Sequence, residues 1–133
     1  MEQEKIAVAT ITNEVYKTEL KARQHTLVAD EPEDVGGKDL GPRPGDFLRM
    51  SLASCKAITL RMYATRKNFE IKEIQVTVST EEGEGKTILH TQIKIDGNLD
   101  EAQHKRMLQI AKLCPVHKML TNPIEINTEL SVS

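Results

Sequence analysis

Alternating apolar and polar positions near the start of the chain predict a group of short β-strands. The first alternating positions are Ile6, Val8, Thr10 and Thr12. This spacing is typical of a half-buried strand, and a turn at Asn13 would lead into a second strand near residues 15–20. A third apolar stretch covers residues 26–29. The segment from Asp30 to Gly45 is rich in acids, glycines and prolines, so we expect a long loop there.

The segment from Asp46 to about Lys67 contains neither Gly nor Pro and predicts a helix with a wide apolar arc. One face carries Leu48, Ser51, Cys55, Ile58, Thr59 and Met62. Arg49, Lys56 and Lys67 form a narrow polar stripe roughly 100° away on the helical wheel. Because a helix that is apolar over most of its circumference is surrounded by other elements, we place this one at the centre of the fold, with Cys55 on its buried face.

Two further alternating segments, joined by a turn at residues 81–85, predict an antiparallel strand pair. Their apolar positions are Ile74, Val76 and Val78 on the first strand and Leu89, Thr91, Ile93 and Ile95 on the return. Asn98 then has the position of an N-cap for a helix that runs to Leu113. Pro115 cannot continue that helix but suits the first turn of a new one, which makes Cys114 the N-cap of a short helix.

A last strand is predicted by the alternation of apolar positions over residues 124–132. The predicted order is therefore three strands, a helix, two strands, two helices and a strand, βββα ββ αα β, which is an α+β fold. The length of 133 residues and the absence of a linker or repeat indicate one domain over residues 1–133. Its modest core favours an oligomer.

Charge and composition exclude several classes of partner. The chain has 18 basic and 20 acidic side chains and a net charge of -2, so no global field would attract nucleic acid or an anionic membrane. Aromatic residues make up 3% of the chain and Trp is absent, which leaves no platform for base stacking. The polar start lacks the pattern of a secretory signal, and no apolar stretch reaches the roughly 18 residues of a membrane span. We expect a cytoplasmic protein.

Two cysteines, Cys55 and Cys114, are the centre of any chemistry that the chain performs. In a reducing compartment a transient, catalytic or sensing disulfide is more common than a structural one, although free cysteines on apolar helical faces are often ordinary core residues. A thiol at a helix N-terminus meets free N–H groups and the positive end of the helix dipole, which favour the Cys114 thiolate. Cys55 lies on an apolar face, so its thiolate needs a cation or donor from elsewhere in the fold.

Two stretches of the sequence resemble the OsmC/Ohr family of thiol-dependent peroxidases: GPRPGDFLRMSLASCKAITLRMYATRKNFEIKEIQV and, much later, CPVHKML. The resemblance covers most of the chain and includes both cysteine contexts and the order of the elements. It implies an intertwined homodimer, with antiparallel sheets around a central cysteine-bearing helix and active sites at the subunit interface.

The resemblance also implies a function and a role for each cysteine. Cys55 matches the peroxide-attacking cysteine and Cys114 the resolving one. The thiolate of Cys55 would attack the O–O bond of a small organic hydroperoxide, and the resulting sulfenic acid would condense with Cys114 to a disulfide. An external dithiol would then reduce this disulfide, with no cofactor and no metal ion. The apolar surroundings of Cys55 suit an alkyl hydroperoxide.

The sequence departs from the peroxidases of this family at two activating positions. Those peroxidases use an Arg from the first strand-turn and a Glu at the start of the central helix, and here Val15 and Gly45 stand at these places. Asp46 is adjacent, but the helical repeat sets it opposite the first cysteine. Arg23 or Arg43 could supply the charge, although nothing in the sequence directs either toward the cysteines.

Three other interpretations of the polar residues stay open. Cys114 and His117 have the spacing of half a zinc site, which Cys55 with His90 or His104 would complete. The ring of His117 could instead lend positive charge to the Cys114 thiolate. The acidic run over residues 30–34 could bind a hard cation, but it lacks the ligand spacing of a calcium loop.

A non-catalytic function is the alternative to the peroxidase. An OsmC-like domain without the activating Arg and Glu could use the interface pocket to bind a small apolar ligand or to report redox state.

Overall fold

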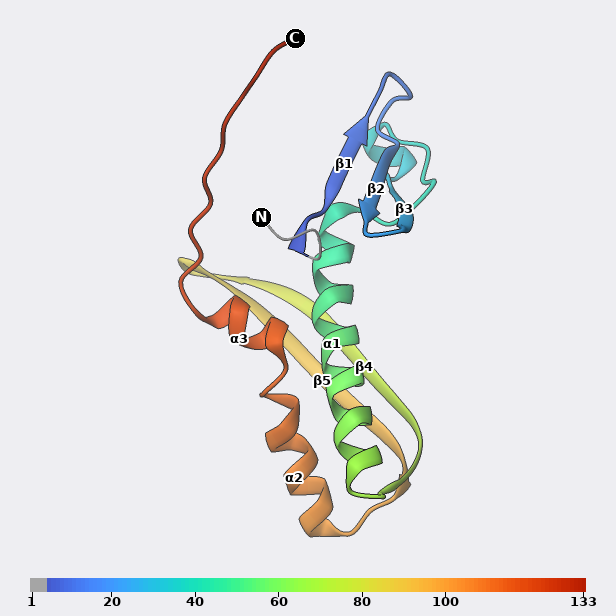
Figure 1. The fold of residues 1–133 in the computed structure, drawn as a ribbon, viewed down its shortest axis with the longest axis vertical. Helices are drawn as coiled ribbons and strands as arrows, with labels where there is room; N and C mark the ends of the chain where they lie inside the picture. Colours follow the sequence, from blue (N-terminus) through green and yellow to red (C-terminus); the bar gives the residue numbers. More distant parts are fainter. Residues whose placement is uncertain (1–4) are drawn as a thin grey trace. The chain divides into compact units, whose positions relative to one another are not determined.

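The computed structural model describes residues 5–133 and divides the chain into two compact units, Met1–Leu48 and Arg49–Ser133. Within these residues it contains two antiparallel sheets and three α-helices, which confirms the predicted α+β class (Figure 1). The prediction of one domain over residues 1–133 stays a prediction. The two units are described separately below.

The first unit contains a three-stranded antiparallel sheet in the order β1-β2-β3. Its strands are β1 (Val8–Ile11), β2 (Thr18–Ala22) and β3 (His25–Ala29). They lie where alternation of apolar residues predicted strands, but the prediction that the first is half-buried is wrong. Val8 and Ile11 remain 52% and 54% exposed, because no described residue covers that part of β1.

The predicted long loop after β3 is ordered by the buried carboxylate of Asp30. Its Oδ1 accepts a hydrogen bond from the N–H of Glu31 at 2.7 Å, and its Oδ2 accepts one from the N–H of Leu40 at 3.1 Å. Burial acts to raise the pKa of Asp30, but the backbone donors outweigh it and the pKa is lowered. The loop also contains a single 3-10 turn, η2 (Glu33–Val35). The Asp30 carboxylate therefore orders the backbone.

Helix α1 (Pro44–Arg66) begins two residues before the predicted start, with Pro44 in its first turn. Pro is favoured there because its fixed φ is helical and its missing N–H would have no helical partner. Asp46 accepts a hydrogen bond from the N–H of Arg43 at 2.9 Å and pairs with its guanidinium group at 3.3 Å. Arg43, a candidate cation for the cysteines, is thus engaged at the start of the helix.

The second unit contains a long antiparallel hairpin of β4 (Glu70–Gly83) and β5 (Lys86–Asn98). Its turn is Glu84–Gly85, where Gly85 adopts a φ of 66° that side-chain-bearing residues rarely adopt. The strand pair was predicted correctly. The observed strands extend well beyond the apolar positions that indicated them.

Two helices follow the hairpin. Helix α2 (Glu101–Ala111) has Asp100 as its N-cap in a capping box with Gln103, so the prediction of Asn98 as the cap is wrong by two residues. Helix α3 (Pro115–Thr121) has Cys114 as its N-cap, as predicted. Among the described residues, no helix is long and apolar enough to cross a bilayer.

The core of the second unit lies where α1 and α2 pack against the hairpin, as the arrangement in Figure 1 indicates. Its buried members are Leu60, Tyr63, Ala64, Met107, Ile110 and Ala111. Tyr63 packs edge-on against Phe69, with ring centroids 5.8 Å apart, and its hydroxyl accepts a hydrogen bond from Arg106 at 3.1 Å. The core therefore ties the second half of α1 to α2.

The buried face of α1 differs from the predicted one. The buried side chains are Leu52, Lys56, Leu60, Tyr63 and Ala64. Ile58 and Met62, which were predicted to be buried, are 55% and 63% exposed, and Cys55 is half-buried at the border between the two faces. The prediction that α1 is surrounded by other elements is therefore wrong for this single chain, and Lys56 lies in the core rather than on a polar stripe.

The strand predicted over residues 124–132 is absent from the described structure. The segment after α3 is extended, and β4 and β5 pair only with each other (Figure 1). Ile126, Leu130 and Val132 are 82%, 89% and 88% exposed. Alternation of apolar residues marks a sequence that can form a strand, but a strand also has to pair with an edge, and this segment pairs with none in the described chain.

Candidate active site

Lys56 is the only charged side chain of α1 that the structure buries within residues 49–66, with 2% of its surface exposed. Its Nζ donates a hydrogen bond to the carbonyl oxygen of Ala111 at 2.7 Å. Ala111 is the last residue of α2, where carbonyl groups lack helical partners and the helix dipole is negative. The ammonium group thus anchors the end of α2 to α1.

The second partner of Lys56 is the imidazole ring of His117, in the first turn of α3. The Nζ of Lys56 lies 2.8 Å from the Nδ1 of His117. An ammonium group can only donate, so Nδ1 must accept and the ring is neutral, with its proton on Nε2. Burial lowers the pKa of His117, and the charges of Lys56 and Lys112 lower it further. The interpretation that His117 supplies positive charge is therefore wrong, and Lys56 is the cation.

The thiol of Cys114 lies at the N-terminus of α3 and is fully buried. Its Sγ accepts a hydrogen bond from the backbone N–H of His117 at 3.3 Å. Burial is the largest influence and raises the pKa of Cys114, and contact with Cys55 raises it further. The His117 N–H and the charge of Lys56 oppose this rise. The predicted effect of the helix end is present, but desolvation outweighs it, so the expectation of a favoured thiolate is wrong.

The two cysteines predicted as the chemical centre meet in the structure. The side chains of Cys55 and Cys114 lie close enough to affect each other, although 59 positions separate them in sequence, and both are free thiols. Cys114 is buried whereas Cys55 is half-buried. A small molecule can therefore reach the sulfur of Cys55 more readily than that of Cys114.

A small cavity borders His117, the histidine that accepts a hydrogen bond from Lys56. It has a volume of about 200 Å³ and is formed by α1, β5 and α3. Its lining residues are Leu52, Thr87, Leu89, Thr91, His117, Leu120 and Thr121. The lining is apolar with a few hydroxyl groups, and its one titratable side chain is the neutral His117. Such a cavity suits an uncharged ligand with an apolar body.

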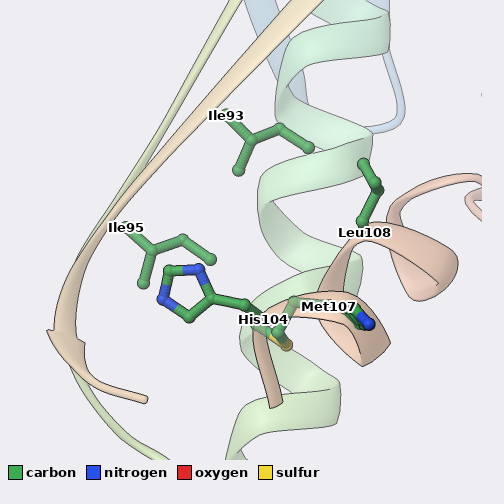
Figure 2. A pocket seen from close by; sticks show the side chains of 6 residues that line it. Ile93, Ile95, His104, Met107 and Leu108 are labelled. Atoms are coloured by element: carbon green, nitrogen blue, oxygen red, sulfur yellow. The ribbon is translucent and has the colours of Figure 1, made fainter. Parts of the chain in front are cut away.

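A larger cavity of about 340 Å³ lies between β5 and α2, and no cysteine lines it (Figure 2). His104 extends into this cavity toward Ile95, so it does not belong to the cysteine pair. His90, the other histidine considered for a zinc site, pairs with Glu81 on the hairpin at 2.7 Å. Within residues 5–133 no group of three or more His, Cys, Asp or Glu side chains is arranged to hold a metal ion.

The family model for OsmC-like protein matches residues 36–129, which include α1, the hairpin, α2, α3 and both cysteines. The chain belongs to the OsmC-like protein family. This confirms the resemblance seen in the sequence. No curated protein matches the chain.

Solved structures of OsmC/Ohr proteins share the fold of this OsmC-like chain. An OsmC-like protein from Mycoplasma pneumoniae has a TM-score of 0.73 and 20% identity, over 90% of this chain and 89% of that one. A protein of the osmotic stress and detoxification response from Psychrobacter arcticus has a TM-score of 0.71 and 24% identity, over 85% of each chain. An organic hydroperoxide resistance protein from Legionella pneumophila has a TM-score of 0.60 and 20% identity, over 87% and 88%.

Sequence reasoning missed Lys56, although a signal for it was present. Leu52, Lys56, Leu60 and Tyr63 recur at intervals of four, four and three residues, which is the periodicity of a single helical face. That face contains a lysine between leucines one turn away on either side. Lysine was assigned to the surface by residue type, and its acceptors, Ala111 and His117, are distant in sequence.

Because the pKa of His117 is lowered in the folded protein, acid should weaken this site. The unfolded chain binds the proton first, so the free energy of unfolding is expected to fall as the pH drops below about 6.5, and to stay constant above it as far as His117 is concerned. Urea denaturation of the protein and of His117→Asn from pH 8 to pH 5 measures this, with the exposed His25→Asn as control. An unchanged pH dependence in His117→Asn would contradict the assignment.

Proposed function

We propose that this OsmC-like protein reduces organic hydroperoxides through Cys55 and Cys114. The observation that carries the proposal is the proximity of two free thiols, one half-buried and one buried, beside the buried cation of Lys56. Family membership and neighbours such as the Legionella pneumophila hydroperoxide resistance protein support a role in hydroperoxide resistance. The roles of the individual cysteines are our assignment.

The proposed cycle has three balanced steps. The Cys55 thiolate attacks the distal oxygen of the hydroperoxide; the O–O bond breaks, and the alcohol leaves with a proton while Cys55 becomes a sulfenic acid. The Cys114 thiol then condenses with the sulfenic acid, which forms the disulfide and releases water. An external dithiol reduces the disulfide and is itself oxidised to a disulfide. The net reaction converts one hydroperoxide and one dithiol into an alcohol, water and an oxidised dithiol.

The exposure of the thiols supports this division of labour. The hydroperoxide must reach the attacking sulfur, and Cys55 is half-buried whereas Cys114 is fully buried. The resolving thiol must meet only the sulfenic acid, which forms on the side chain that it already contacts. Its raised pKa keeps Cys114 protonated, so it does not compete for the peroxide.

The cavity beside His117 supports a neutral substrate with an apolar group. Its leucines can contact an alkyl or aryl chain, and its threonines can bond to a hydroperoxide. A cationic substrate would be repelled by Lys56, and an anionic one would need to leave water for a mostly apolar lining.

A non-catalytic function is the second candidate, and the cavity of Figure 2 favours it. That cavity is larger than the one beside His117 and is lined mainly by apolar residues. It could hold a small apolar ligand with no redox step.

Oxidation by one equivalent of cumene hydroperoxide distinguishes the two candidates. We expect loss of both thiols per chain within the mixing time of a thiol-counting assay, and recovery on addition of dithiothreitol. Cys55→Ser should abolish the reaction, whereas Cys114→Ser should still lose the Cys55 thiol but form no intrachain disulfide. Two unreacted thiols in the wild-type protein would exclude the peroxidase and leave ligand binding.

We propose further that the protein is a homodimer, in which the second copy covers the exposed apolar surface and pairs with the final segment. Ile58 and Met62 on α1 and the apolar residues after α3 are exposed in the single chain. A second copy could cover them and give the predicted strand over residues 124–132 a partner edge.

Sedimentation equilibrium at micromolar concentration is expected to give twice the mass of the chain. The double substitution Ile126→Lys and Leu130→Lys places two charges in the exposed segment and should shift the equilibrium toward monomer, because buried charges oppose association. Glu129→Lys, on the alternate side of the same segment, is the control. A wild-type monomer would refute the dimer.

A further inference from the structure

Lys56 is a buried cation with no buried anion beside it. Its two acceptors, the Ala111 carbonyl and the His117 ring, are both neutral. Among residues 5–133 no carboxylate pairs with Lys56. Burying an ammonium group is unfavourable unless hydrogen bonds or a negative charge compensate, and here only the hydrogen bonds are present in the reduced protein.

The groups around this cation can supply the missing negative charge in one way. The titratable side chains that face it are Cys55 beside it on α1 and Cys114 and His117 at the start of α3, with the cation Lys112 at the end of α2. His117 and Lys112 can only be neutral or positive. One of the two thiols must therefore lose its proton to supply a negative charge that balances the charge of Lys56.

We propose that Lys56 is the positioning residue that serves the cysteine pair, in place of the Arg and Glu that this chain lacks, by balancing a single negative charge shared between Cys55 and Cys114. The catalytic role of Lys56 rests on the proposed function. The charge balance between Lys56 and the thiols does not depend on it and can be tested without a peroxide. When the pair ionises, the proton leaves to solvent, and the thiolate of Cys55 stays in contact with the protonated Cys114. The charge is then available on Cys55, the sulfur that solvent can reach.

Lys56 also fixes the geometry of the pair. One hydrogen bond holds the end of α2 and the other holds the first turn of α3, and Cys114 lies between these two anchors. The same His117 whose ring accepts from Lys56 donates its backbone N–H to the Cys114 sulfur. Lys56 thereby places Cys114 against Cys55, while its charge favours the ionised form.

Two substitutions separate the charge from the geometry. Lys56→Gln removes the charge but keeps an N–H donor, whereas Lys56→Arg keeps the charge on a larger, planar guanidinium group. The readout is the pH dependence of thiol alkylation by iodoacetamide in the reduced full-length protein, which needs no peroxide. We expect Lys56→Gln to move the alkylation midpoint upward by roughly one pH unit, about tenfold slower at pH 7, and Lys56→Arg to restore most of the rate.

The matched comparison is Lys112→Gln: this cation of the same cluster is exposed and screened by solvent, so its loss should move the midpoint much less than Lys56→Gln does. Circular dichroism establishes that each variant is folded. If Lys56→Gln does not fold, Lys56→Met, which removes the charge and keeps an unbranched apolar chain, takes its place. An unchanged midpoint in a folded Lys56→Met variant refutes the proposal.

The outcome for Lys56 is distinguishable from that for the peroxidase. An unchanged midpoint in a folded Lys56→Gln variant overturns the role of Lys56, even if the wild type consumes hydroperoxide. A shifted midpoint in a protein whose thiols do not react with cumene hydroperoxide upholds Lys56 and refutes the proposed function.

Discussion

The hydrogen bonds of the buried Lys56 ammonium group determine how the second unit is assembled around its cysteines. One side chain from α1 reaches the last carbonyl of α2 and the ring at the start of α3. The break between these two helices is imposed by Pro115, which cannot continue α2. Cys114 is the residue at that break, so the proline and the lysine together determine where its sulfur lies.

The same contacts give the two thiols different environments. Desolvation raises the pKa of Cys114 by more than the helix N-terminus and the charge of Lys56 lower it. Cys55 lies at the border between the buried and exposed faces of α1, within reach of solvent. A pair that combines a reachable sulfur with a protonated, buried neighbour is suited to a reaction in which one thiol attacks and the other resolves.

The sequence predicted the fold well where local signals are strong and failed where partners are distant. Alternation of apolar residues located the strands of both sheets, and Pro115 located the break before α3. The resemblance in the two cysteine segments predicted the family. The prediction of the buried face of α1 was wrong because Lys56 was assigned to the surface by its residue type. Its neutral acceptors are distant in sequence and could not be inferred from it. The prediction of a last strand over residues 124–132 was wrong because alternation of apolar residues does not show whether the segment will pair with a neighbouring strand.

In the proposed cycle, Cys55 and Cys114 of one chain form a single reactive pair. Peptide mapping after oxidation with one equivalent of an organic hydroperoxide, without added reductant, measures this pairing. We expect one cross-linked peptide that joins Cys55 to Cys114 and a chain that runs as a monomer on a non-reducing denaturing gel. A disulfide between two chains, or a Cys55 oxidised to sulfinic acid while Cys114 stays reduced, would contradict it.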